Sequence, residues 1–249
     1  MRPDVDSDSL KQGAPWSVCA TTGFSFLIGG AFFSIQALVL GAFVGIAMYG
    51  NPDLTISPFL SDIRSNGLFL AVATCVSSPV CIALTVWCVR IKKAWSVRKY
   101  LALRKVERTV LLKWLGVALL FAVCSDVLTV LLGRKILPDF VARAYATAAF
   151  VPLLWIALVV AAPAFEEVFF RGFLFQGLQH SRVGPIGAVI LTSIIFGFIH
   201  FQYDLYGMAT ALAIGLLLGT ARWKTDSLYP AAAMHALINF LAILEAALL

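Results

Sequence analysis

The stretch Ala161–Phe175, "AAPAFEEVFFRGFLF", places two adjacent carboxylates and a guanidinium in a run that is otherwise apolar. The charged residues are Glu166, Glu167 and Arg171, and the apolar run around them covers residues 153–178. A helix of roughly 20 apolar residues crosses a hydrocarbon core about 30 Å thick. The sequence therefore predicts a membrane-spanning helix with three ionisable side chains inside it.

The whole chain has the composition of a polytopic membrane protein. Of its 249 residues, 61% are apolar and 13% are charged, and the mean hydropathy is +0.91. This composition is too apolar for an ordinary soluble domain. We expect an all-α membrane helix bundle with about seven transmembrane helices, at residues 23–48, 67–89, 114–132, 153–178, 185–202, 207–222 and 229–247.

The chain divides into three parts. Residues 1–22 are expected to form a cytoplasmic tail. Residues 23–145 are expected to hold N-terminal transmembrane helices with a basic cytoplasmic loop at residues 90–113, and residues 146–249 the helices that carry polar motifs. The first apolar run is interpreted as a retained helix, because it is too long for a signal-peptide core and lacks a basic leader.

The distribution of Lys and Arg predicts the orientation, because cytoplasmic loops accumulate them. With the N-terminus inside, 14 of the 19 basic residues lie in inner segments, whereas the outer segments hold only Arg64, Arg134, Lys135 and Arg143. The C-terminus is then outside. The basic loop, "RIKKAWSVRKYLALRKVERTVLLK", joins two spans, so it is interpreted as an anchor on anionic lipid rather than a nucleic-acid site.

The cysteines predict neither a disulfide framework nor a metal site. They contain no CxxC pair, and four of them lie within apolar runs, where a thiol behaves as a small hydrophobe. We expect no metal and no other cofactor. The cysteines are Cys19, Cys75, Cys81, Cys88 and Cys124.

The charges in the fourth span are costly for membrane insertion. Each costs about 2.5–3.5 kcal/mol at a helix centre, so the three together cost roughly 7–10 kcal/mol. The Leu, Ile, Val and Phe residues of the run return roughly 4–8 kcal/mol. This helix therefore needs polar partners within the bundle, and buried ionisable residues of this kind indicate a functional site.

The three charges divide into a pair and a single carboxylate. Glu167 and Arg171 are four residues apart, so they lie on one helix face and can form an ion pair. Glu166 points about 100° away from that face. It is therefore left without a partner on its own helix.

Two later helices supply polar side chains that can meet this carboxylate. In "TSIIFGFIHF", Phe196 and His200 are four residues apart, and in "PAAAMHALINF", His235 and Asn239 have the same spacing. Residues four apart face one side of a helix. We expect Glu166, His200 and the pair on the last helix to converge around one hydrated point within the membrane.

A helix with Glu-Glu-x-x-x-Arg, followed by Phe-x-x-x-His and then His-x-x-x-Asn, resembles the CPBP family. This family comprises the CAAX-processing and bacteriocin-processing intramembrane proteases, including the type 2 CAAX prenyl endopeptidases. The resemblance covers roughly residues 150–245, with intervals of 34 and 35 residues between Glu166, His200 and His235. The first 140 residues contain no motif of this kind.

The resemblance implies a glutamate-dependent endopeptidase whose site opens from the membrane. Glu166 and His200 would activate a water molecule, and His235 and Asn239 would hold the developing oxyanion. Glu167 and Arg171 would orient the first helix. The implied partner is a membrane-associated peptide or protein, with prenylated CAAX peptides as the family's eukaryotic precedent.

Three alternatives remain open. Glu and His also bind zinc, so the site could belong to a zinc-dependent membrane protease, although no His-Glu-x-x-His sequence is present. The same fold could serve as a non-catalytic immunity or scaffold protein. Buried carboxylates could also relay protons in a transporter, although the repeated halves typical of transporters are missing.

The remaining polar residues in the spans are interpreted mainly as structural. Asp126 is expected to bond Ser125 or a neighbouring helix, or to pair with Arg171, while Gln36 and Glu245 are expected to make contacts between helices or at the interface. Two glycine pairs, Gly41 with Gly45 and Gly215 with Gly219, have the spacing that lets helices approach closely. The small size and compact loops favour a bacterial plasma membrane.

Overall fold

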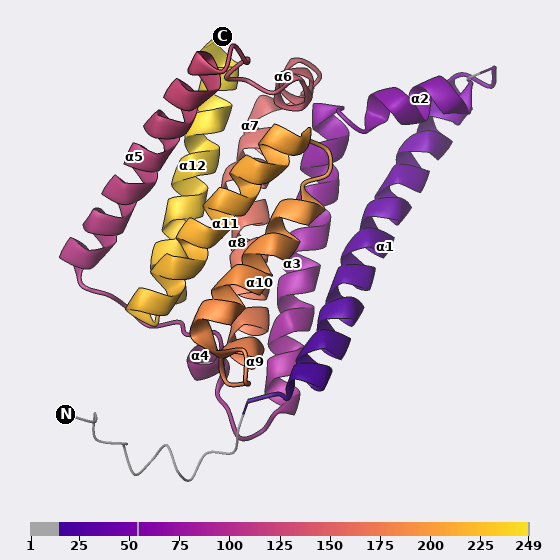
Figure 1. Cartoon of the computed structure of the whole chain (residues 1–249). Helices are drawn as coiled ribbons and strands as arrows, with labels where there is room; N and C mark the ends of the chain where they lie inside the picture. The colour runs from indigo at the N-terminus through magenta and orange to yellow at the C-terminus, as the bar shows by residue number, and fades with distance from the viewer. Residues whose placement is uncertain (1–14, 54, 249) are drawn as a thin grey trace, which may run out of the picture.

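The chain runs up and down through a bundle of helices, and α1 begins on the side opposite to the one where α12 ends (Figure 1). The computed structural model describes residues 15–53 and 55–248. The helices, in chain order, are α1 (Val18–Gly50), α2 (Ile56–Ile63), α3 (Gly67–Ile91), α4 (Val97–Tyr100), α5 (Arg108–Leu131), α6 (Asp139–Ala146), α7 (Val151–Trp155), η1 (Ile156–Ala161), α8 (Ala162–Glu167), η2 (Val168–Leu174), α9 (Phe175–Gln179), α10 (Gly184–Ile199), α11 (Leu205–Thr225) and α12 (Leu228–Leu248).

The predicted all-α membrane bundle is confirmed. In residues 15–53 and 55–248, six helical segments are long and apolar enough to cross a membrane: α1, α3, α5, the segment Val151–Gln179 from α7 to α9, α11 and α12. The shorter α10 is also apolar, which gives the expected total of about seven. Its sixteen residues rise only about 24 Å, less than the hydrocarbon thickness. The chain is thus an integral, multi-pass membrane protein.

The helix boundaries differ from the sequence expectations at several points. α1 begins five residues before the predicted start at residue 23, because Ser17 caps it by accepting a hydrogen bond from the Ala20 N–H. Residues 1–14 of the expected tail lie outside the described residues. The basic loop is interrupted by the short α4, and the sequence analysis did not predict α2 or α6.

Basic residues gather at the end of the bundle from which α1 starts. The helix ends and connecting segments at that end hold Arg90, Lys92, Lys93, Arg98, Lys99, Arg104, Lys105, Arg108, Lys113, Arg182, Arg222 and Lys224. Arg64, Arg134, Lys135 and Arg143 lie at the opposite end, with α2 and α6. Arg2 and Lys11, also counted as inner, are outside the described residues. The folded chain thus has one strongly basic end.

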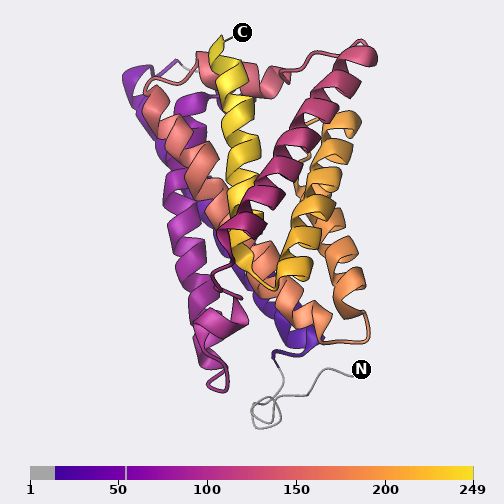
Figure 2. The same ribbon diagram turned by 90° about the vertical axis from the view of Figure 1, so that its left-hand side faces the viewer.

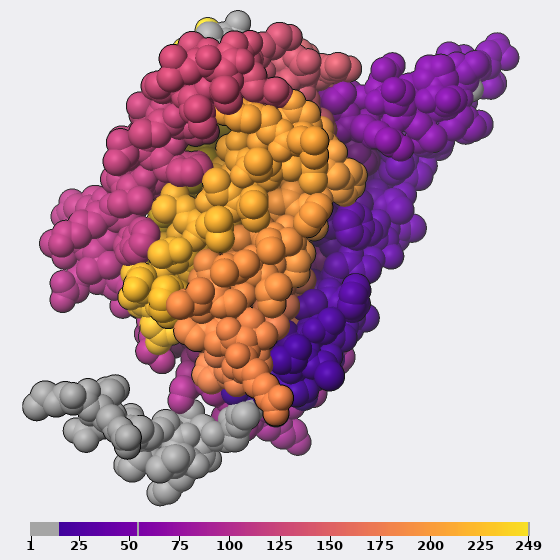
Figure 3. All heavy atoms as spheres, in the orientation of Figure 1, coloured from indigo at the N-terminus to yellow at the C-terminus, as the bar shows by residue number. Residues whose placement is uncertain are grey.

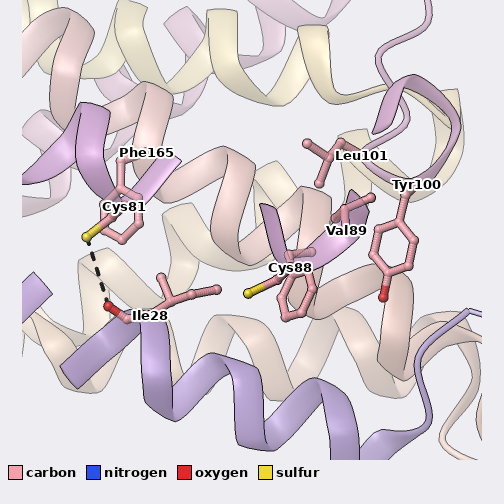
Figure 4. Packing of buried hydrophobic residues seen from close by; sticks show 8 residues of the cluster. Ile28, Cys81, Cys88, Val89, Tyr100, Leu101 and Phe165 are labelled. Carbon is pink, nitrogen blue, oxygen red and sulfur yellow. Dashed lines mark hydrogen bonds between the residues drawn. The ribbon is translucent and has the colours of Figure 1, made fainter. Parts of the chain in front are cut away.

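A hydrophobic cluster joins the fourth span to the first two (Figure 4). Ile28 of α1, Cys81 and Cys88 of α3, and Phe165 of α8 are buried in it, and the Cys81 thiol donates a hydrogen bond to the Ile28 carbonyl. Nearby, the Gln36 side chain donates to Ser77 Oγ over 3.1 Å, which is the interhelical contact expected of it. These contacts fix α8 against α1 and α3.

Two glycines let α10 and α11 pack closely. A Cβ atom on Gly215 would lie 3.1 Å from Ser193 Cβ, and one on Gly219 would lie 3.1 Å from Val189 Cγ1. By contrast, a Cβ on Gly41 or Gly45 would meet nothing within 4 Å. Only the second of the two predicted glycine pairs therefore serves close packing. Together, α10 and α11 form a continuous surface in front of α8 (Figures 1 and 3).

The turn between α11 and α12 is set back into the bundle relative to the turn between α9 and α10 (Figures 1 and 2). The turn between α11 and α12 is hydrogen-bonded to the segment after α4. Ser227 Oγ donates to the Arg104 carbonyl over 2.5 Å, and the Leu228 N–H donates to the Ala102 carbonyl over 2.9 Å. This set-back turn starts α12 deeper than α9 ends. His235 is thereby raised to the level of the two glutamates.

At the opposite end, side-chain contacts hold the loop between α5 and α6 against the start of α11. Arg134 forms an ion pair with Asp204 and lies 4.7 Å from the centroid of the Tyr206 ring. Phe140 of α6 packs edge-on against Tyr203, with ring centroids 5.8 Å apart. These contacts hold the turn that follows His200.

Candidate active site

The two adjacent glutamates lie between two π-helical segments. η1 precedes α8 and η2 follows it, so the span from α7 to α9 is a single helix with two changes of hydrogen-bond register. At the end of η2, the Phe175 N–H bonds to the Phe170 carbonyl, five residues back instead of four. Short π segments inside α-helices occur frequently at functional sites, because they re-aim side chains. Here they set the direction of Glu166 and Glu167.

Glu167 accepts two hydrogen bonds with one carboxylate oxygen. Arg171 NH1 donates to Oε1 over 2.9 Å, and His235 Nδ1 lies 2.9 Å from the same oxygen. Glu167 and Arg171 are fully buried, and His235 is 4% exposed. The ion pair expected from the spacing of Glu167 and Arg171 is therefore present. It is extended by an imidazole from α12.

Because the Glu167 carboxylate accepts from His235 Nδ1, that nitrogen carries a proton. The other ring nitrogen, Nε2, lies 3.8 Å from Glu166 Oε2. The imidazole of His235 is thus placed between the two glutamates. A carboxylate that fixes one imidazole nitrogen and leaves the other for chemistry is the arrangement by which hydrolases orient a catalytic histidine.

Glu166 is the less buried of the two carboxylates, with 19% of its side chain exposed. Within the described residues, three buried polar atoms of this cluster have no hydrogen-bond partner: Glu166 Oε2, Glu167 Oε2 and Arg171 Nε. Buried polar atoms are nearly always paired, so unpaired ones in a native fold call for an explanation. Their unused bonding capacity can serve a substrate or an attacking water molecule.

The ring of Phe196 joins the polar residues of three helices. It lies 4.6 Å from the Arg171 guanidinium carbon, 4.6 Å from the His200 ring and 5.6 Å from the His235 ring, measured to ring centroids. The Phe-x-x-x-His motif therefore places both members at the site. Among the described residues, no hydrogen bond or ion pair joins His200 to Glu166 or Glu167, and its ring contacts are with Phe196 and Tyr203.

His200 ends α10, and its orientation is fixed from two sides. Its Nδ1 lies 2.6 Å from the Phe196 carbonyl oxygen, and the Tyr203 ring stacks on the imidazole at 6.1 Å with an interplanar angle of 12°. A carbonyl oxygen can only accept, so Nδ1 carries the proton. In the neutral imidazole, Nε2 is then the nitrogen that can take up a proton.

Asn239 is one turn beyond His235 on α12, and it bonds to the fourth span. Its side-chain nitrogen donates to the Leu158 carbonyl over 2.8 Å. Leu158 belongs to η1, where the shift in register alters which backbone carbonyls are paired within the helix. One N–H of Asn239 therefore ties α12 to the fourth span, while an amide group carries a second N–H.

Two other ionisable residues of the spans lie apart from this cluster. The carboxyls of Asp126 on α5 and Glu245 on α12 interact with each other, so Asp126 faces a neighbouring helix, one of the arrangements expected for it. Another expected arrangement, pairing with Arg171, is not formed, because Arg171 pairs with Glu167. His180, at the basic end, is exposed and packs against Trp95.

The sequence analysis missed two residues that contact the cluster. The Gly215 carbonyl accepts a hydrogen bond from Arg171 NH2 over 3.1 Å, and Arg222 Nε donates to the Arg171 carbonyl over 3.0 Å. The sequence pattern predicts only close packing for Gly215 and a basic loop position for Arg222. The one available signal was the four-residue spacing from Arg222 to Asp226, which permits an ion pair.

The donor set was tested for a metal site. Among the described residues, no group of three or more His, Cys, Asp and Glu side chains has an arrangement that could hold a metal ion. Structural and catalytic zinc sites take at least three protein ligands. The residues at this site thus do not match the zinc coordination that the alternative reading requires.

Comparison with known proteins agrees with the three motifs. Residues 148–241 match the family model described as type II CAAX prenyl endopeptidase Rce1-like. The match contains Glu166, Glu167, Arg171, His200 and both motif residues of α12. Searches of curated proteins and of solved structures found no match. The resemblance is thus confirmed, and over residues 148–241 this chain is similar to the Rce1-like type II CAAX prenyl endopeptidases, a family of CAAX-type membrane proteases.

Proposed function

We propose that the protein is an intramembrane endopeptidase that hydrolyses a peptide bond in a membrane-associated substrate. The observation that carries the proposal is the buried cluster in which His235 lies between Glu166 and Glu167. A charged cluster inside apolar helices costs insertion energy, which a catalytic role explains. The family resemblance over residues 148–241 supports the same reaction class.

Glu166 and His200 are the proposed acid–base pair. Hydrolysis of an amide requires a group that takes a proton from water as the water oxygen attacks the carbonyl carbon. Glu166 has an unpaired buried oxygen, and the protonated Nδ1 of His200 leaves its Nε2 as an acceptor. The proton removed from water then passes to the leaving nitrogen as the carbon–nitrogen bond breaks.

His235 and Asn239 are the proposed donors to the tetrahedral oxygen. Donors aimed at this oxygen stabilise the charge that develops in the transition state. His235 donates from Nε2 when that nitrogen also carries a proton, and Glu167 balances the resulting charge from the other side of the ring. Asn239 contributes the N–H that is not used by the Leu158 carbonyl. Both side chains project from one face of α12.

The substrate and the setting follow from the family and from the charge distribution. A prenylated CAAX-type peptide is the proposed substrate class, since the matching family is described by that reaction. The N-terminus and the basic end are proposed to face the cytoplasm of a bacterial plasma membrane, where Lys and Arg contact anionic lipid.

The proposal is tested by cleavage of a fluorescent peptide in reconstituted vesicles, with prenylated and unprenylated versions of the same CAAX sequence. Glu166→Gln and His200→Ala are each expected to lower turnover by at least about 10²-fold, the contribution of a positioned acid or base. Glu245→Gln is the matched control for the glutamate, because Glu245 lies on the far part of α12. Full activity in either site variant would contradict the assignment.

Two further measurements separate the alternatives. Activity that survives a strong chelator removes zinc dependence, whereas loss of activity that is restored by added zinc favours a zinc-dependent protease. A protein that binds the peptide tightly but does not cleave it at any site would be a scaffold or immunity protein of the same fold.

A further inference from the structure

Arg222 is a buried cation that no motif explains. It lies near the end of α11, in a helix that crosses the membrane, and only 1% of the residue is exposed. A buried arginine is costly unless its donors are used. Its contacts therefore show what the residue does.

The Arg222 guanidinium contacts both the backbone and the side chains of the fourth span. Nε donates to the Arg171 carbonyl over 3.0 Å, and NH2 donates to Gln176 Oε1 over 3.2 Å. The guanidinium carbon lies 5.0 Å from the centroid of the Phe175 ring. The third nitrogen, NH1, donates to Asp226 Oδ1 over 3.1 Å at the end of α11. Every nitrogen of the group is thus engaged.

The bond to the Arg171 carbonyl replaces one that the π segment removes. In an α-helix, the Phe175 N–H would donate to the Arg171 carbonyl, four residues back. In η2 it donates to the Phe170 carbonyl instead. The side chain of Arg222 supplies a donor to the carbonyl that this shift bypasses. It therefore stabilises the π register at the position of Arg171.

The connection between Arg171 and α11 is reciprocal. Arg171 NH2 donates to the Gly215 carbonyl, and Arg222 donates to the Arg171 carbonyl. Gly215 and Arg222 are seven residues apart, about two helical turns, so they lie on the same face of α11. Both the backbone and the side chain of Arg171 are thus fixed by one helix.

We propose that Arg222 is a positioning residue of the site, acting through Arg171 on Glu167 and His235. It fixes the Arg171 backbone, so the guanidinium of Arg171 meets Glu167, and Glu167 in turn holds His235 Nδ1. The effect of these contacts on turnover rests on the proposed peptidase function. The effect of Arg222 on the geometry of the site does not, because the protonation of His235 Nδ1 can be observed directly.

The test compares Arg222→Gln with two matched variants. Lys224→Gln removes a positive charge from the same end of α11, but Lys224 is exposed and lies over the Trp223 ring. Asp226→Asn breaks the ion pair at the end of the helix and leaves the Arg171 carbonyl contact in place. Arg222→Lys keeps the charge but lacks the planar fork that serves three acceptors.

The first readout is nitrogen NMR of the protein labelled at its histidine rings. The wild type and the variants Lys224→Gln and Asp226→Asn are expected to show His235 protonated at Nδ1 and hydrogen-bonded. Arg222→Gln and Arg222→Lys are expected to shift this signal or to mix the two tautomers. An unchanged His235 signal in folded Arg222→Gln protein would overturn the proposal.

The second readout is the cleavage kinetics. Arg222→Gln is expected to lower kcat by about 10²-fold, as small displacements of reacting groups do, with KM changed less than twofold. If the NMR signal shifts while no peptide is cleaved even by the wild type, the proposed function fails and the positioning role stands. If Lys224→Gln lowers kcat as much as Arg222→Gln, the proposal is overturned. If Arg222→Gln does not fold, the same two measurements are made on Arg222→Lys, with the same expected results.

Discussion

At the scale of single residues, Glu167 is the residue on which the site depends most. Its Oε1 atom receives both the Arg171 guanidinium and His235 Nδ1 in a fully buried setting. Removing one partner of a buried ion pair leaves a charge without compensation, whereas replacing both partners by apolar groups is often neutral. Glu167 thus has a structural role toward Arg171 and an orienting role toward His235.

These two roles can be separated by a pair of variants. Glu167→Gln is expected to lower the free energy of unfolding by about 3–5 kcal/mol, because it leaves the Arg171 cation unpaired. The double variant Glu167→Gln with Arg171→Met is expected to recover most of that loss, since it removes both charges of the pair. Thermal unfolding in detergent measures both changes.

The same double variant is expected to remain inactive, because nothing holds the His235 ring. Glu245→Gln serves as the control for loss of a glutamate in a span. Recovery of both stability and turnover in the double variant would show that Glu167 acts only as the counter-ion of Arg171.

At the scale of elements, the contact between α10 and α11 decides where His200 stands. The two helices approach through Gly215 and Gly219, and Gly215 also accepts the bond from Arg171. His200 ends the shorter of the two helices, and its turn is clasped by Arg134 and Asp204. A change at the glycine contact is therefore transmitted to both imidazoles.

Gly215→Val is expected to destabilise the fold by about 1–3 kcal/mol, the usual range for overpacking. Its Cβ would lie 3.1 Å from Ser193 Cβ, and the added methyl groups would push α10 away from α11. Gly45→Val is the matched control, because a Cβ there meets nothing within 4 Å. Unfolding in detergent and peptide cleavage measure the two effects, and equal effects of both substitutions would contradict this account.

At the scale of the whole molecule, the distribution of basic residues predicts the orientation in the membrane. The turns at one end of the bundle contain most of the basic residues, and the C-terminal end of α12 lies at the other. The positive-inside rule predicts that the N-terminus and the loop after α3 face the cytoplasm. With seven crossings, the same rule predicts that the C-terminus is outside.

Reporter fusions test this orientation. Alkaline phosphatase fused after Leu249 is expected to be active, because the enzyme folds only outside the cytoplasm, and a fusion after Ala94 is expected to be inactive. Green fluorescent protein at the same two positions should give the reverse pattern. The opposite result with both reporters would show that the bundle is inserted the other way round.

The sequence by itself determined the class of protein and the presence of ionisable side chains inside its spans. Apolar runs of sufficient length and the cost of burying Glu166, Glu167 and Arg171 are properties of single segments, so they can be evaluated before any helix is packed. The four-residue spacing of Glu167 and Arg171 likewise predicts their ion pair, because both residues share one helix.

Only the tertiary structure decided which side chains of different helices are neighbours. It placed His235 on Glu167 and beside Glu166, directed Asn239 to the Leu158 carbonyl, and directed Arg222 to the Arg171 carbonyl. It also showed that Gly215 and Gly219 pack while Gly41 and Gly45 do not. These outcomes depend on the rotation and depth of each helix relative to the next. A shift of one residue rotates a side chain by about 100°, and the sequence of an isolated helix does not fix that rotation.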